Sequence, residues 1–190
     1  RLEMFQAFVA CGGFSYGEAD LAQMLHDIDM ARDLGLAGVV FGALTDEGAL
    51  DSHVLQRLSR HAAGLDLTLH RAFDCCGPDF DRAVDTAIEL GFDRVLTSGG
   101  ENTALEGLAA LERIFAKAGT RITIMPGSGV SADNVSTIAT RLPVREIHAS
   151  CSTAFPVSAA AENRLGFATE HARQTDAVKV RALKAALAAV

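Results

Sequence analysis

Several features that define common protein classes are scarce or missing in this chain of 190 residues. It has four cysteines, which are too few and too irregularly spaced for a disulfide scaffold, and it has no Cys-x-x-Cys motif. Asp, Glu, Arg and Gly interrupt every apolar run, so no segment reaches the roughly 18 to 20 apolar residues that a membrane span requires. We therefore expect a soluble protein of the reducing cytoplasm, without a membrane partner.

Positively charged residues are also few. The chain carries 17 Lys and Arg against 24 Asp and Glu, for a net charge of −7, and its longest basic cluster is Lys179, Arg181 and Lys184. Nucleic acid is therefore not an expected partner. The three lysines lie on predicted helices rather than at strand ends, which argues against a Schiff-base aldolase or a pyridoxal enzyme. A Walker loop and a His-Glu-x-x-His zinc helix are absent as well.

What the chain does have is a repeated junction, in which a helical pattern ends at glycine and a β-rich run follows at once. These glycines are Gly35, Gly64, Gly91 and Gly119, at spacings of 29, 27 and 28 residues. The pattern predicts strands at 39–41, 65–73, 92–97 and 121–125, another at Val144–Ser150, and a weaker one at Leu2–Cys11. A β-turn-α unit of this length is typical of parallel strands with helical crossovers.

Polar residues alternate with apolar ones on these strands, which favours a barrel with a wet mouth over an open, doubly wound sheet. Asp66, Thr68 and His70 share one strand face, and Glu146, His148 and Ser150 share another. We therefore predict an α/β fold of the TIM (β/α) barrel type. It is incomplete at its N-terminal side, because about six of eight strands are visible. Residues 1–190 are expected to form one domain, with a long loop at 151–172 and a last helix at Ala172–Val190.

In such folds the functional site lies at the carboxyl ends of the strands. Two of these ends are rich in glycine and precede a predicted helix, so their free N–H groups would favour phosphate or carboxylate, although glycine there also suits a plain tight turn. The predicted residues for binding a small anionic ligand are Arg71, Thr97, Ser98, Gly99, Gly127, Ser128, Gly129 and Ser150.

The same strand ends carry titratable residues. His70, Asp74, Glu146 and His148 are candidates for acid-base catalysis, and Asp74 is alternatively a local ion-pair partner of Arg71. A metal site built from His70, His148, Cys76 and Cys151 is a second interpretation, because histidine and cysteine suit copper or zinc. Hydrogen-bonded interior histidines are the third.

Four segments together resemble one known family. They are Leu69-His70-Arg71-Ala72-Phe73-Asp74 with Cys76, Arg94-Val95-Leu96-Thr97-Ser98-Gly99, Ile124-Met125-Pro126-Gly127-Ser128-Gly129-Val130 and Glu146-Ile147-His148-Ala149-Ser150. In this order they resemble the CutC copper homeostasis family. The resemblance implies a TIM-type barrel, a cytoplasmic homo-oligomer and a role in copper handling, with Cu(I) as the bound ion.

Three hypotheses about function follow. The first is a copper-binding protein of copper homeostasis, as the resemblance implies. The second is a barrel enzyme that acts on a small anionic or phosphorylated metabolite, with the strand-end glycines holding the anion and the histidines moving protons. The third is a barrel that serves as an oligomeric scaffold.

Overall fold

The computed structural model of the protein describes residues 4–6, 13–77, 79–156 and 171–189. Five parallel strands form one sheet in the order of the sequence, with each strand bonded to the next. The strands are β1 (Met4–Gln6), β2 (Gly38–Phe41), β3 (Asp66–Leu69), β4 (Arg94–Thr97) and β5 (Thr123–Pro126). The predicted strands at the four glycine junctions are all present, and β1 lies within the predicted Leu2–Cys11 run.

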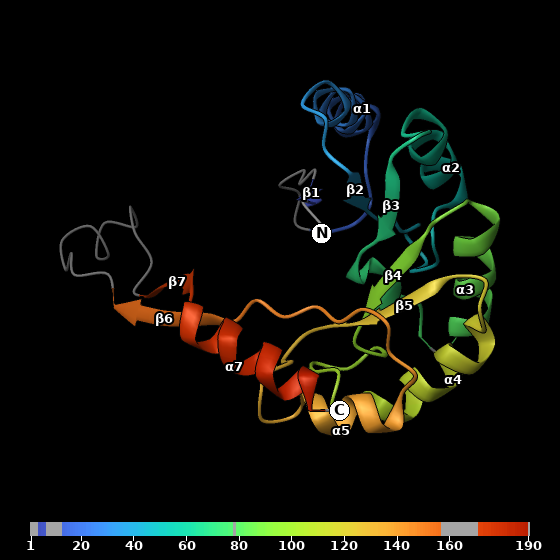
Figure 1. Cartoon of the computed structure of the whole chain (residues 1–190). Helices are drawn as coiled ribbons and strands as arrows, with labels where there is room; N and C mark the ends of the chain where they lie inside the picture. Colours follow the sequence, from blue (N-terminus) through green and yellow to red (C-terminus); the bar gives the residue numbers. More distant parts are fainter. Residues whose placement is uncertain (1–3, 7–12, 78, 157–170, 190) are drawn as a thin grey trace.

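Helices connect the strands and follow one another in an arc around the outside of the sheet (Figure 1). They are α1 (Glu18–Asp33), α2 (Ser52–His61), α3 (Phe80–Glu89), α4 (Leu108–Ala118) and α5 (Val135–Arg141), with a short 3₁₀ helix, η1 (Arg71–Cys76), directly after β3. This arrangement is the β/α architecture of a TIM-type barrel. Within the described residues its hydrogen-bonded sheet has five strands and ends at β1 and β5.

The glycines at the junctions work as the sequence pattern predicts. Gly35, Gly64, Gly91 and Gly119 all have positive φ, between 58° and 90°, a region that other residues rarely adopt. Each one follows a helix and lets the chain reverse into the next strand. The helices and strands then pack their apolar faces together in one core, whose largest fully buried side chains include Phe41, Phe73, Met24, Ile28, Leu111 and Ile124.

The prediction of a strand at Val144–Ser150 is wrong, because this segment has no regular secondary structure. The segment lies beside β5 but joins it through a single backbone bond, in which the His148 N–H donates to the Pro126 carbonyl at 2.9 Å. A parallel ladder would add a bond from the N–H of residue 126 to the carbonyl of residue 146. Proline has no N–H, so Pro126 removes that bond and the ladder stops.

The predicted loop at 151–172 and the predicted start of the last helix also need correction. Strands β6 (Ser152–Pro156) and β7 (His171–Thr175) pair in an antiparallel hairpin, and helix α7 (Ala177–Ala188) follows. The rest of the predicted loop, 157–170, lies outside the described residues. The helix begins five residues later than predicted because Asp176 caps it, its side chain accepting from the Val178 N–H at 2.7 Å.

Candidate functional site

The carboxyl ends of β3, β4 and β5 lie side by side, and most of the predicted site residues lie in the turns that follow them. Residues 70–76 follow β3, 98–100 follow β4 and 127–129 follow β5, while 148–151 run past the end of β5. The structure nevertheless divides these residues among separate environments.

Asp74, on η1, is the centre of the hydrogen bonding at the end of β4. Its carboxylate accepts from the backbone N–H groups of Ser98 and Gly100 at 3.1 Å each, and from the hydroxyl groups of Thr97 and Ser98. Arg71 donates its Nε–H to the same carboxylate at 2.6 Å, so the predicted ion pair is present. The Asp74 side chain is only 9% exposed. Its bonds fix the β3 and β4 ends to each other, which suits a positioning residue better than a proton carrier.

These contacts also change the interpretation of the first predicted anion site, at Thr97, Ser98 and Gly99. The Ser98 and Gly100 N–H groups bond to Asp74, and the Gly99 N–H donates to the Thr97 hydroxyl at 2.9 Å. The protein's own carboxylate thus occupies the position that an external anion would take. The predicted helix after this turn is α4, which begins at Leu108.

The second predicted anion site, at Gly127–Gly129, is open. Ser128 and Gly129 both have positive φ, 76° and 68°. Gly127 donates its N–H to the Thr97 carbonyl, and the Ser128 hydroxyl donates to the Asn102 carbonyl at 2.6 Å. The N–H groups of Ser128, Gly129 and Val130 have no hydrogen-bond partner among the described residues. The predicted helix after this turn is α5, which begins at Val135.

The two predicted histidines lie in different surroundings. The His70 ring caps η1 by accepting from the Ala72 N–H at 3.1 Å, and it packs on Phe14 with 4.9 Å between ring centroids. His148 lines a pocket at the carboxyl end of β5, and His70 does not. Burial lowers the pKa of both histidines below the ordinary value, so both rings are neutral at pH 7. The structure therefore does not bring them together as an acid-base pair in one pocket.

Glu146 does not line the pocket that contains His148. Its carboxylate accepts from Arg94 Nε at 2.8 Å, and Arg94, on β4, also donates to the Thr68 hydroxyl at 3.2 Å. The Arg94 side chain is 8% exposed, so the ion pair is buried on one side. It attaches the irregular segment at 144–150 to the sheet in place of the missing ladder bonds.

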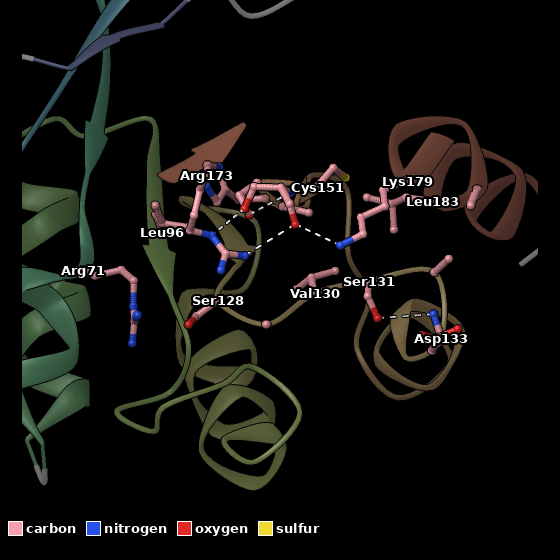
Figure 2. Close-up of a pocket in the computed structure, with 17 residues that line it drawn as sticks. Arg71, Leu96, Ser128, Val130, Ser131, Asp133, Cys151, Arg173, Lys179 and Leu183 are labelled. Carbon is pink, nitrogen blue, oxygen red and sulfur yellow. Dashed lines mark hydrogen bonds between the residues drawn. The ribbon is translucent and has the colours of Figure 1, made fainter. Parts of the chain in front are cut away.

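The large pocket that His148 lines has a volume of about 680 Å³, within the usual range for a small-molecule site. Ser128 and Val130 lie on one side of it, and Arg173 of β7 and Lys179 of α7 lie on the other (Figure 2). Its lining residues are Arg71, Leu96, Ser128–Asp133, His148–Ser152, Arg173, Lys179, Ala182 and Leu183. The predicted residues that meet there are Arg71, Ser128, Gly129, His148, Ser150 and Cys151.

Two cationic residues of this pocket were not predicted, Arg173 on β7 and Lys179 on α7. Both point towards the Ser152 carbonyl, which accepts from Lys179 Nζ at 2.9 Å and from Arg173 Nη2 at 3.4 Å (Figure 2). The signal that could have found them is Asp176, a typical N-cap residue. It separates the hairpin from the helix, whereas a helix drawn from Ala172 hides the position of Arg173.

The predicted metal ligands are also divided. Cys76 lies in a second pocket of about 240 Å³, together with Cys75, and burial raises the pKa of its thiol to about 11. Cys151 lies in the large pocket with His148, in a backbone conformation with φ of 46°. Among the described residues there is no group of three or more His, Cys, Asp or Glu side chains that could hold a metal ion. Two of the four predicted ligands therefore share a pocket.

No helix in the described part of the chain is long and apolar enough to cross a membrane.

Comparison with known proteins gives a consistent result. The model of the CutC family matches residues 9–153. A protein named CutC from Sinorhizobium medicae is 50% identical over 179 residues, covering 94% of this chain and 73% of that protein. A CutC from Agrobacterium fabrum is 48% identical over 179 residues, covering 93% of this chain and 69% of the relative.

Two solved structures add to this comparison. A CutC from Streptococcus agalactiae, provisionally described as a copper homeostasis protein, is 30% identical with a TM-score of 0.73, over 76% of this chain and 70% of that one. An aldolase designated QR15 is 15% identical with a TM-score of 0.55, over 73% of this chain and 63% of that one. The second likeness concerns the fold alone.

Proposed function

Because the chain belongs to the CutC family, we propose that it acts in copper homeostasis and that it binds Cu(I) through Cys151 and His148. One observation carries this choice of ligands. Cys151 and His148 are the two predicted metal ligands that line one pocket, whereas Cys76 lines another and His70 lines neither the first nor the second.

The chemistry of the two groups suits Cu(I). Thiolate is a soft ligand that Cu(I) prefers, and imidazole binds copper in its neutral form. Burial lowers the pKa of His148, which keeps its ring neutral and free of a competing proton at pH 7. Cys151 is partly exposed, so an ion can reach it from the pocket.

The alternatives among the other predicted ligands are weaker on the same grounds. A pKa of about 11 keeps the Cys76 thiol protonated at neutral pH, and a protonated thiol is a poor ligand. One nitrogen of His70 already accepts from the Ala72 N–H. A site with two protein ligands leaves the copper ion open to a further ligand, which suits transfer of copper better than storage.

We also infer a cytoplasmic location. It is supported by Cys75, Cys76 and Cys151, which are all free thiols among the described residues. The homo-oligomer that the resemblance implies stays a prediction.

The test is an anaerobic titration of the reduced protein with Cu(I) against a competing chelator. We expect about one copper ion per chain, with affinity at least about 100-fold lower in Cys151→Ser and about 10-fold lower in His148→Ala. Cys75→Ser is the matched control, because Cys75 is exposed and lies outside the large pocket. Absence of stoichiometric uptake, or uptake that Cys151→Ser leaves unchanged, would overturn the proposal.

A further inference from the structure

The large pocket carries a second set of groups that the copper proposal does not use. They are the cationic side chains Arg71, Arg173 and Lys179 and the N–H groups of Ser128, Gly129 and Val130. The charge of the pocket is opposite to that of the whole chain. Three cationic side chains and one carboxylate, that of Asp133, line the pocket of a chain whose net charge is −7. Arg71 is paired with Asp74, so Arg173 and Lys179 carry the positive charge that remains for a ligand. Such a local excess of positive charge attracts anions.

The three consecutive residues at the end of β5 supply hydrogen-bond donors. Ser128 and Gly129 both have positive φ, and the N–H groups of residues 128–130 find no partner within the described part of the chain. Backbone N–H groups left free in a turn of this kind bind phosphate oxygens in many proteins. The corresponding N–H groups at Ser98 and Gly100 are satisfied by Asp74, so the two turns differ in this respect.

Arg173 and Lys179 supply donors from the opposite side. Arg173 donates to Ser152 through Nε and Nη2, which leaves Nη1 without a hydrogen-bond partner among the described residues. Lys179 uses one of its three N–H bonds on the Ser152 carbonyl. Both head groups lie beside the Ser152 carbonyl, their shared acceptor, above Val130 in Figure 2. An oxyanion bound between these head groups and the turn at 128–130 would meet fixed N–H groups on one side and full positive charges on the other.

The remaining wall is apolar and would face the body of an organic ligand. It is formed by Leu96, Val130, Ala149, Ala182 and Leu183. A volume of about 680 Å³ is several times that of a phosphate ion, so the pocket has room for an organic group attached to it.

From these observations we propose that the pocket binds a small phosphate monoester. The Ser128–Val130 N–H groups, Arg173 and Lys179 hold its phosphate, and Leu96 and Leu183 contact its organic part. This site goes beyond the proposed function, because it uses neither the Cys151 thiol nor the His148 ring.

The test uses calorimetric titration with phenyl phosphate, and with inorganic phosphate for comparison. We expect saturable binding of both, with phenyl phosphate bound more tightly because its ring buries apolar surface. Arg173→Gln and Lys179→Gln should each weaken binding about 10-fold or more. Lys184→Gln is the matched control, since Lys184 is exposed on the same helix and does not line the pocket.

A second measurement locates the phosphate. In ¹⁵N-resolved NMR spectra, the amide signals of Ser128, Gly129 and Val130 should shift on addition of inorganic phosphate, whereas those of Ser98 and Gly100 should not. No binding to the parent protein would overturn the proposal. So would binding that Arg173→Gln and Lys179→Gln weaken no more than Lys184→Gln does, or unchanged amide signals at 128–130.

The two proposals fail separately. Cys151→Ser should lower copper affinity at least about 100-fold and leave phenyl phosphate binding within about twofold of the parent. Arg173→Gln should weaken phenyl phosphate binding about 10-fold or more and leave copper affinity within about twofold of the parent. A loss of both in one variant would instead indicate a general collapse of the pocket and contradict two distinct sites.

Discussion

Replacing Asp74 by asparagine tests whether this carboxylate fixes the carboxyl end of the sheet. The amide oxygen can still accept from Thr97, Ser98 and Gly100, but the amide nitrogen cannot accept from Arg71 Nε or the Ser98 hydroxyl. Hydrogen bonds to a charged group contribute about 1.5 to 3 kcal/mol each. Arg71 is 39% exposed and regains water, so the lower end of the range applies to its bond. We expect a loss of about 3 kcal/mol in the free energy of unfolding.

Urea denaturation followed by circular dichroism measures this loss. With a slope of about 2 kcal/mol per M, the midpoint should fall by about 1.5 M at unchanged slope. Asp33→Asn is the control, since Asp33 is exposed at the end of α1 and should change stability by less than about 0.5 kcal/mol. If Asp74→Asn differed from the parent no more than Asp33→Asn does, the role assigned to Asp74 would be wrong.

Three further predictions concern the fold. Gly107→Ala should lower the melting temperature by several degrees, because its Cβ would overlap the Ser98 carbonyl at a cost of about 2 to 3 kcal/mol, and an unchanged melting temperature would contradict this. Glu146→Ala should lower the free energy of unfolding by about 2 kcal/mol in urea denaturation, because the buried Arg94 guanidinium keeps only its longer, 3.5 Å ionic contact with Asp66. A loss below about 0.5 kcal/mol would refute the pairing. Burial lowers the pKa of His70 in the folded protein below the ordinary 6.5, so the unfolded chain is protonated first as pH falls. The neutral, buried ring therefore contributes stability above pH 6.5, and this contribution is lost as pH falls through the folded pKa. His70→Asn should therefore lose less stability than the parent between about pH 7 and pH 5, and equal losses would exclude this contribution.

The fold was largely predictable because its signals are local. A glycine with positive φ at each of Gly35, Gly64, Gly91 and Gly119 ends one helix and starts one strand, and both periodicities are visible on either side. The segment at 144–150 has the alternation of a strand, but its ladder depends on a partner. That partner contains Pro126, and strand pairing cannot be recognised from the segment itself.

The site was less predictable because its residues act across long separations. Asp74 and the turn at Ser98–Gly100 are 24 to 26 residues apart. Neither segment alone indicates that the Asp74 carboxylate accepts hydrogen bonds from the N–H groups of this turn. The open turn at Gly127–Gly129 has the same appearance in the sequence. Arg173 and Lys179 reach the pocket only through the hairpin of β6 and β7, which local patterns did not indicate.

The most direct test of the account is X-ray absorption spectroscopy of the protein loaded with one equivalent of Cu(I). The account predicts one sulfur ligand from Cys151 and one imidazole nitrogen ligand from His148, with the sulfur contribution lost in Cys151→Ser. A spectrum without sulfur, or one that Cys151→Ser leaves unchanged, would contradict the assignment of copper to this pocket.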